Sequence, residues 1–310
     1  ALSFAFVATA VFAVAGLYKR SWRYVNFTQS GFLVAVILGG TSLAWLITSV
    51  FPQARAEASS LIEVAVVHWA FAILGLLFTA IALRWVLVPP FYGRQIVRQM
   101  VDIGYYSLPV VGLTTLFSGM VLALQSYTGF ARFSAEDTVA TVVVLSITRE
   151  LGPVLAGLMV AGRVGASIAA EIGTMRVTDQ IDALDTLSTR PMQYLVGPRI
   201  IAGIVCLPIL VLIGDIIGVF GGYLVGVYNL DFNASVYLSK TLEFLEFEDV
   251  FIGLVKAAIF GFIIAVMGCY HGYYSGRGAE GVGKATTNAV VSASILILIA
   301  NYTVTALFFG

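Results

Sequence analysis

Two oppositely charged residues, Arg149 and Glu150, stand side by side in the apolar run LSITRELGPVLAGLMVAGRVGASIAAEIGTMR, residues 145–176. A charged side chain at the centre of a membrane span costs about 2.5–3.5 kcal/mol on insertion scales, so it normally faces a bundle interior, a cavity or a ligand. Neighbouring residues on a helix do not face each other, so each charge needs another partner. The pair therefore predicts either a polar spot in a substrate cavity or a salt bridge between helices.

Pro153 adds to the polarity of this segment. Its ring displaces the carbonyl of Arg149 from the helical hydrogen-bond ladder. We therefore expect the carbonyl oxygen of Arg149 to be available to another group.

The loop GRGAEGVGKATT, residues 276–287, carries the glycine spacing G-x-G-x-x-G and nearly matches a P-loop. Ala285 stands where a P-loop needs Ser or Thr to bind magnesium. Both motifs also require a preceding strand of a parallel sheet, whereas a membrane span precedes this loop. We interpret it as a cytoplasmic turn that opens the last helix near Thr286 and Thr287, and we expect no ATP hydrolysis by this chain.

Other chemistry-bearing residues form no recognisable constellation. His68 and His271 have no Cys, Asp or Glu at metal-ligand spacing, and the sequence contains neither a nucleophilic triad nor an HExxH motif. Cys206 and Cys269 both fall inside apolar segments, which favours buried hydrophobic side chains over a disulfide. We predict no catalytic residue, no metal site and no cofactor bound by this chain.

The composition indicates an integral membrane protein. The 310 residues are 59% hydrophobic and only 11% charged, and the mean hydropathy is +0.96. Basic and acidic residues balance at 17 each, so bulk charge does not suggest nucleic-acid binding. We therefore predict an all-α polytopic membrane protein.

Segments of about 20 apolar residues can cross the hydrocarbon core. The predicted spans lie near residues 1–18, 31–51, 61–88, 104–124, 138–162, 200–228, 250–270 and 288–310.

Basic residues cluster in alternate connections, which the positive-inside rule places in the cytoplasm. These connections lie around residues 19–30, 89–103, 163–199 and 271–287. The same rule leaves both termini outside, together with an acidic loop formed by Glu243, Glu246, Glu248 and Asp249.

A change in composition near Pro89 and Pro90 marks a domain boundary. Residues 1–90 form an accessory apolar N-terminal region, and residues 91–310 form the core with five spans. Residues 91–103 carry charges among apolar side chains, which fits either an amphipathic helix in the membrane interface or a short cytoplasmic linker.

Small residues repeat at four-residue spacing along two predicted spans. Such stripes let helix backbones approach closely in lipid, so both should be packing surfaces. The first stripe is Gly157, Ala161 and Gly165, and the second is Gly214, Gly218, Gly222 and Gly226. Asp215 lies beside the second stripe and needs a partner, but its role stays open.

The connection at 163–199 contains VTDQIDALDTL, which has the period of a short amphipathic helix. Its apolar face is Val177, Ile181, Leu184 and Leu187, and its acidic edge is Asp179, Asp182 and Asp185. An acidic edge suits an anionic membrane surface poorly. We therefore favour docking on a soluble partner protein over a helix lying on the membrane.

The run RELGPVLAGLMVAGRVGASIAAEIGTMRVTDQIDAL, followed by PRIIAGIVCLPIL and GVGKATTNAVV, resembles the MlaE family of ABC transporter permeases. The family also includes the plastid inner-envelope lipid permease. The resemblance covers residues 91–310, and its long central run is highly specific. Residues 1–90 depart from the family pattern, which puts the family's count of five spans in doubt for the whole chain.

The resemblance implies a homodimer in which each subunit has an interfacial helix and five spans. Its partners would be a pair of cytoplasmic ABC ATPases, which bind ATP and magnesium, a periplasmic MCE-domain lipid carrier and, in many members, a STAS-domain protein. Position by position, the implied lipid-cavity residues are Arg149, Glu150, Tyr127 and Gln125, and the implied ATPase-coupling residues are Glu171, Arg176, Asp179 and Asp182.

The resulting hypothesis is the membrane subunit of an ATP-driven transporter that moves phospholipids between the inner membrane and a periplasmic carrier. The location implied is the Gram-negative inner membrane in preference to the plastid inner envelope. An ion-coupled secondary transporter that uses Glu150 and Asp215 is the alternative. A scaffold that transports nothing is a third reading.

Overall fold

The computed structural model describes residues 74–84, 88–89, 92–133 and 138–309. The predicted spans near 1–18 and 31–51, and most of the one near 61–88, lie outside these ranges. After a short apolar helix, Leu74–Arg84, the α-helices are α4 (Gly93–Ile103), α5 (Leu108–Phe130), α6 (Val139–Ser146), α7 (Gly152–Val160), α8 (Ala166–Val177), α9 (Gln180–Thr186), α10 (Gly197–Tyr228), α11 (Ala234–Glu243), α12 (Phe247–Tyr273) and α13 (Gly278–Phe309).

Five helical runs in the described residues are long and apolar enough to cross a membrane. They are Gly93–Phe130, Val139–Val177, Met192–Tyr228, Phe247–Tyr273 and Gly278–Phe308. In hydrocarbon every backbone polar group must be satisfied within the chain, which helices achieve locally. The described ranges contain no strand, so the predicted all-α polytopic fold with five spans in the core is confirmed.

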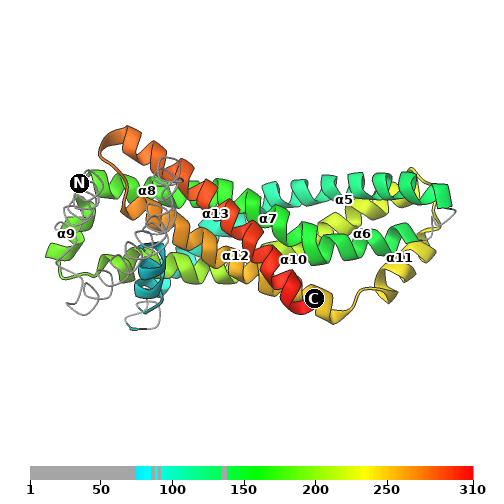
Figure 1. Ribbon diagram of the computed structural model, residues 1–310, viewed down its shortest axis with the longest axis horizontal. Coiled ribbons are helices and arrows are strands. Elements are labelled where there is room, and N and C mark those ends of the chain that lie inside the picture. The colour runs from blue at the N-terminus through cyan, green and yellow to red at the C-terminus, as the bar shows by residue number, and fades with distance from the viewer. Residues whose placement is uncertain (1–73, 85–87, 90–91, 134–137, 310) are drawn as a thin grey trace, which may run out of the picture. The chain divides into compact units, whose positions relative to one another are not determined.

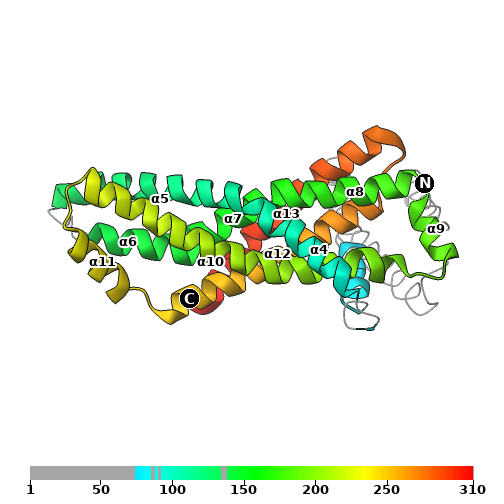
Figure 2. The same ribbon diagram turned by 180° about the vertical axis from the view of Figure 1, so that it is seen from behind.

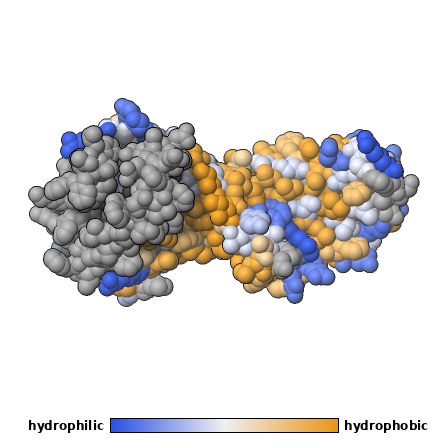
Figure 3. All heavy atoms as spheres, viewed as in Figure 1, coloured by the Kyte–Doolittle hydropathy of each residue, from blue (hydrophilic) through white to orange (hydrophobic). Residues whose placement is uncertain are grey.

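Successive runs cross the helical bundle in alternate directions. Helices α8 and α9 therefore lie at one end and α11 lies at the other, as Figures 1 and 2 show. On the face that Figure 3 shows, apolar side chains dominate the coloured surface between these ends. This arrangement matches a bundle that spans a bilayer and exposes its connections on the two sides.

Helices α5, α10 and α12 approach one another closely at glycines. A Cβ atom on Gly119 of α5 would overlap the carbonyl group of Gly218 of α10, and one on Gly203 of α10 would lie 2.7 Å from the carbonyl oxygen of Gly261 of α12. Side chains larger than hydrogen would push these backbones apart. Close van der Waals contact of this kind holds helices together where lipid offers no hydrophobic driving force.

The predicted stripe on α10 faces several neighbours. Gly214 lies against Val111 and Thr115 of α5, whereas a Cβ on Gly222 would lie 2.6 Å from Val143 of α6. The first stripe faces α12, because a Cβ on Gly157 would lie 3.1 Å from the ring of Phe260. A Cβ on Gly165 would likewise lie 3.7 Å from Ile264 of α12.

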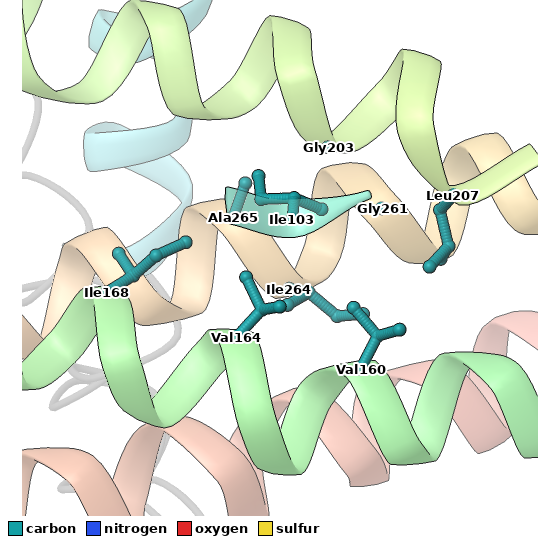
Figure 4. Close-up of a pocket in the computed structure, with 9 residues that line it drawn as sticks. All are labelled: Ile103, Val160, Val164, Ile168, Gly203, Leu207, Gly261, Ile264 and Ala265. Carbon is teal, nitrogen blue, oxygen red and sulfur yellow. The ribbon is translucent and has the colours of Figure 1, made fainter. Parts of the chain in front are cut away.

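A small apolar void lies where α4, α7, α8, α10 and α12 converge (Figure 4). Its volume is about 10 Å³, close to the minimum for one water molecule. Its lining residues are Ile103, Val160, Val164, Ile168, Gly203, Leu207, Gly261, Ile264 and Ala265. With no polar side chain and so little space, this void is a packing defect and not a lipid site.

Two sequence predictions of helix limits were wrong. The amphipathic helix is shorter than predicted: Val177 belongs to α8, Leu187 follows α9 and is 74% exposed, and only Ile181 is fully buried. Tertiary packing thus buries only one residue of the predicted apolar face. The last helix begins at Gly278 and not near Thr286, because Gly278 adopts a positive φ of 73° that an L side chain rarely tolerates.

The glycine contact between α5 and α10 predicts that the effect of a Gly→Ala substitution on stability depends on its position. Gly119→Ala should lower the free energy of unfolding by about 1–3 kcal/mol, because the new Cβ overlaps backbone atoms that cannot move aside. Thermal unfolding of the purified protein in detergent measures this effect. Gly283→Ala is the matched control, since nothing lies within 4 Å of its Cβ position on α13. Equal unfolding midpoints for the two variants would contradict this account of the packing.

Candidate functional site

Arg149 and Glu150 each pair with a residue of α12. The Nε and Nη2 atoms of Arg149 both lie 2.7 Å from Oδ1 of Asp249. Glu150 Oε1 lies 2.8 Å from the ammonium group of Lys256. The prediction that the two neighbours do not pair with each other is confirmed, and the interhelical salt bridge that the sequence offered as one alternative is present twice.

Asp249 corrects the predicted limits of the acidic loop, whereas the side of the membrane on which that loop lies stays a prediction. The sequence placed Asp249 in an acidic loop outside the membrane, whereas it lies in the first turn of α12 and is 1% exposed. Its Oδ2 accepts a hydrogen bond from the backbone N–H of Glu246 at 3.4 Å. Asp249 therefore satisfies both the beginning of α12 and the guanidinium of Arg149.

The carboxylate of Glu150 collects hydrogen bonds from two further helical residues. Asn301 donates its Nδ2 to Oε2 at 2.9 Å, and Thr305 donates its hydroxyl to Oε1 at 2.9 Å. Both donors lie on α13, one turn apart. Together with Lys256, they link the segment between α6 and α7 to α12 and α13 through one carboxylate.

Pro153 creates the last contact of this network. The segment Ile147–Leu151 is π-helical, and the N–H of Gly152 donates to the carbonyl of Ile147 five residues earlier. The carbonyl of Arg149 cannot receive the missing N–H of Pro153 and instead accepts a hydrogen bond from Nζ of Lys256 at 2.9 Å. The prediction that this oxygen becomes available to another group is confirmed.

The polar network, defined here as Arg149, Glu150, Asp249, Lys256, Asn301 and Thr305, combines buried and open parts. Lys256 is fully buried and the Asp249 side chain is 2% exposed, whereas the Arg149 and Glu150 side chains are 35% and 38% exposed. The two α12 charges are therefore held inside the bundle, and their partners reach the surface of this subunit. A surface with both signs of charge on apolar helices can contact a polar group that travels through the membrane.

Tyr127 and Gln125 lie elsewhere on α5. Tyr127 packs edge-on against Phe232 with 5.7 Å between ring centroids, beside a buried cluster that includes Val139 and Val143. Gln125 is exposed. In the described part of the chain, no hydrogen bond or ion pair joins either residue to the polar network. Their predicted role at the outer mouth of a lipid cavity stays a prediction.

The predicted coupling residues gather around α8 and α9. Glu171 pairs at 2.7 Å with the buried Arg199 of α10, and Arg176 pairs at 2.9 Å with Asp182. The guanidinium of Arg176 also lies over the ring of Tyr273, 5.9 Å from its centroid. Asp179 has a positive φ of 56° and separates α8 from α9. These contacts fix the two helices against α10 and α12, and contact with an ATPase stays a prediction.

Asp215 lies inside the contact between α10 and α7. It is 5% exposed and its Oδ1 has no hydrogen-bond partner among the described residues. That oxygen occupies the space in which a Cβ of Gly152 would stand. The absence of a side chain at Gly152 therefore makes room for the carboxyl group.

The sequence interpretation missed Lys256, Asn301 and Thr305. A signal was present for the first, because a single lysine within FIGLVKAAIFGF needs an anionic partner in the membrane and Glu150 needs a cationic one. Asn301 and Thr305 carry no such signal. Amides and hydroxyls are common in spans, and only the packing of α13 reveals which acceptor they reach.

The described residues contain no group of three His, Cys, Asp or Glu side chains that could hold a metal ion. His271 instead contacts the hydroxyl of Ser292 at 3.0 Å. Both cysteines are free and buried.

Removing one charge of the network should destabilise the protein more than removing two. Glu150→Gln leaves the fully buried Lys256 without an anion, and we expect a loss of about 3 kcal/mol in the free energy of unfolding. Adding Lys256→Met should recover most of that loss. Thermal unfolding of both single variants and the double variant gives the coupling energy. Strictly additive effects would show that the pair contributes no coupling.

The chain matches a known protein family. Residues 96–307 match the family described as Permease MlaE. A probable ABC transporter permease protein of Rickettsia prowazekii is 68% identical over 233 residues, which cover 75% of this chain and 90% of the relative.

More distant relatives match a similar share of the chain. The intermembrane phospholipid transport system permease protein MlaE of Haemophilus influenzae is 37% identical over 69% of this chain and 83% of its own. The chloroplastic protein TRIGALACTOSYLDIACYLGLYCEROL 1 of Arabidopsis thaliana is 36% identical over 70% of this chain and 62% of its own. With a match across most of the described bundle, the chain belongs to the MlaE family of ABC transporter permeases.

Proposed function

We propose that this permease is the membrane subunit of an ATP-driven transporter of phospholipids. The observation that carries the proposal is the polar network, which presents charges of both signs at the subunit surface within an apolar span. The printed name of the Haemophilus influenzae relative, a phospholipid transport permease, supports the same substrate class. A phospholipid headgroup is the polar group that such a protein would have to move.

The network has the chemistry to contact a headgroup. Arginine suits the phosphate oxygens, which its planar guanidinium can bind through two N–H groups. A carboxylate such as Glu150 suits the amine of a zwitterionic headgroup. Because Lys256 and Asp249 are buried, they hold Arg149 and Glu150 in place while both remain accessible. This division between held and exposed charges is what a transient binding surface requires.

The proposed assembly places different partners at the two ends of the bundle. Two copies of this chain would form the permease, and a pair of cytoplasmic ABC ATPases would bind near α8 and α9, where Asp182 is 61% exposed. A periplasmic MCE-domain carrier would receive or deliver lipid at the α11 end, and a STAS-domain protein would attach on the ATPase side. ATP and magnesium would then bind only to the ATPase chains, in a Gram-negative inner membrane.

Ion-coupled transport is the alternative that one observation favours. Asp215 is a buried carboxyl group whose Oδ1 has no partner among the described residues, as a proton site could have. Membership of an ABC permease family argues for ATP as the energy source instead. Transport that continues after a proton ionophore is added and stops without ATP would separate the two mechanisms.

Lipid transfer by the reconstituted complex tests the role of the polar network. In the complex with its ATPase and lipid-carrier partners, the double variant Glu150→Gln/Lys256→Met should transfer fluorescent phospholipid at least about tenfold more slowly, a barrier increase of about 1.4 kcal/mol. The double variant is used because it leaves no unpaired buried charge. ATP hydrolysis, measured in the same vesicles, should continue.

A second ion pair, at the beginning of α13, provides the matched control. Glu280 and Lys284 form an exposed ion pair at 2.7 Å, and Glu280→Gln/Lys284→Gln removes the same two charges far from the network. This control should transfer lipid at the normal rate. Normal transfer by the network variant would contradict the proposed role, and transfer that needs no ATP would contradict the proposed energy source.

A further inference from the structure

A second polar site lies toward the α8–α9 end of the bundle. It is a groove of about 700 Å³ between α4, α8 and the beginning of α10. Its polar lining includes Arg98 and Gln99 of α4, Glu171 of α8, Tyr194 and Arg199. Apolar side chains such as Met175 and Leu195 complete the wall. The groove is therefore amphipathic and large enough for a small molecule or a lipid headgroup.

Gln99 lines this groove, and its side-chain amide is open to the groove. It is 8% exposed, and its side-chain amide makes no hydrogen bond with the described residues. Among the groove residues, the polar atom that is fully buried without a partner is Nε of Arg199. Gln95, one turn before Gln99 on the same helix, is different from Gln99 because its amide donates to the hydroxyl of Tyr194 at 2.8 Å. The free amide of Gln99 is thus available as a hydrogen-bond donor inside the groove.

The charges of the groove favour an anion. Arg199 is 3% exposed, pairs with Glu171 at 2.7 Å and donates to the carbonyl of Leu195 at 2.6 Å. These contacts balance its charge within the protein. Arg98 forms no ion pair in the part of the chain that the structure describes, so one positive charge in the lining is left without an anion.

The position of α4 indicates that the anion belongs to a membrane lipid. Val97 and Val101 are 61% and 45% exposed on this helix, which forms the beginning of the membrane-crossing run Gly93–Phe130. An amphipathic helix with exposed apolar residues and arginines lies at the boundary between headgroups and acyl chains. The arginine beside the groove is then at the depth of lipid phosphates.

We propose that this groove binds the phosphate group of an anionic phospholipid from the leaflet on the α9 side. Arg98 supplies the charge and Gln99 donates a hydrogen bond, while the apolar wall accepts the beginning of the acyl chains. The site is separate from the polar network around Glu150 and does not rest on the proposed transport function. A lipid bound here would connect α4 to α8 and α10, next to the Glu171–Arg199 pair.

Native mass spectrometry of the purified full-length protein with its natural partners tests this site. The protein is titrated with dioleoyl phosphatidylglycerol, and the dissociation constant of the tightest lipid is measured for each variant. Arg98→Gln should weaken that binding about tenfold, and Gln99→Glu should weaken it at least as much because it places a negative charge beside the phosphate. Arg94→Gln is the matched control, since Arg94 is exposed on the same helix but does not line the groove.

Three outcomes decide the proposal. Weaker binding by Arg98→Gln but not by Arg94→Gln, with no binding of dioleoylglycerol at the site, would support a phosphate site for lipid. Equal effects of the two arginine variants would overturn it, because bulk charge would then explain the binding. Displacement of the lipid by inorganic phosphate at equal concentration would also overturn it and assign the groove to a soluble phosphate compound. Thermal unfolding of each variant checks that the fold is intact.

Discussion

The described bundle depends on the interactions of one buried cation, the ammonium group of Lys256. It is fully buried, and it bonds both the carboxylate of Glu150 and the carbonyl oxygen that Pro153 removes from the helical ladder of its own segment. An isolated cation at this depth would be strongly unfavourable, so its partners cannot move apart freely. The lysine therefore fixes the irregular segment between α6 and α7 against α12, and through Asn301 and Thr305 against α13.

Close helix contacts at glycines allow these charged side chains to reach one another. A Cβ on Gly253 of α12 would lie 2.6 Å from the carbonyl oxygen of Thr148, one residue before Arg149. Without that close approach, Lys256 and Asp249 could not both reach the 149–150 pair. Gly119 and Gly218 bring α5 and α10 together in the same way on another side. Small residues thus set the helix separations, and the polar network selects one arrangement among those that the separations allow.

Sequence reasoning recovered what depends on local properties. Hydropathy is a property of each segment, so the five spans of the core follow from it, and the freed carbonyl of Arg149 follows from the covalent geometry of Pro153. The identity of the partners does not, because Lys256 is more than 100 residues away and its distance from Glu150 is a result of tertiary packing. Asp249 illustrates the same limit: a carboxylate at the edge of an apolar segment looks like part of a loop until Arg149 is placed beside it. The beginning of α13 shows a lesser limit of sequence reasoning. The helix begins at Gly278, which has a positive φ, and this is earlier than the apolar pattern suggests.

The central claim is that the polar network lies on the path of a phospholipid headgroup during ATP-driven transport. A small diazirine-bearing residue in place of Thr305, which contacts Glu150, tests it directly through photo-cross-linking to labelled phospholipid in the reconstituted complex. We expect strong cross-linking that changes when the ATPase turns over, whereas the same probe at Ile209, an exposed apolar position on α10, should give a constant signal. Cross-linking at position 305 that is absent, or that is as insensitive to ATP as at position 209, would contradict the claim.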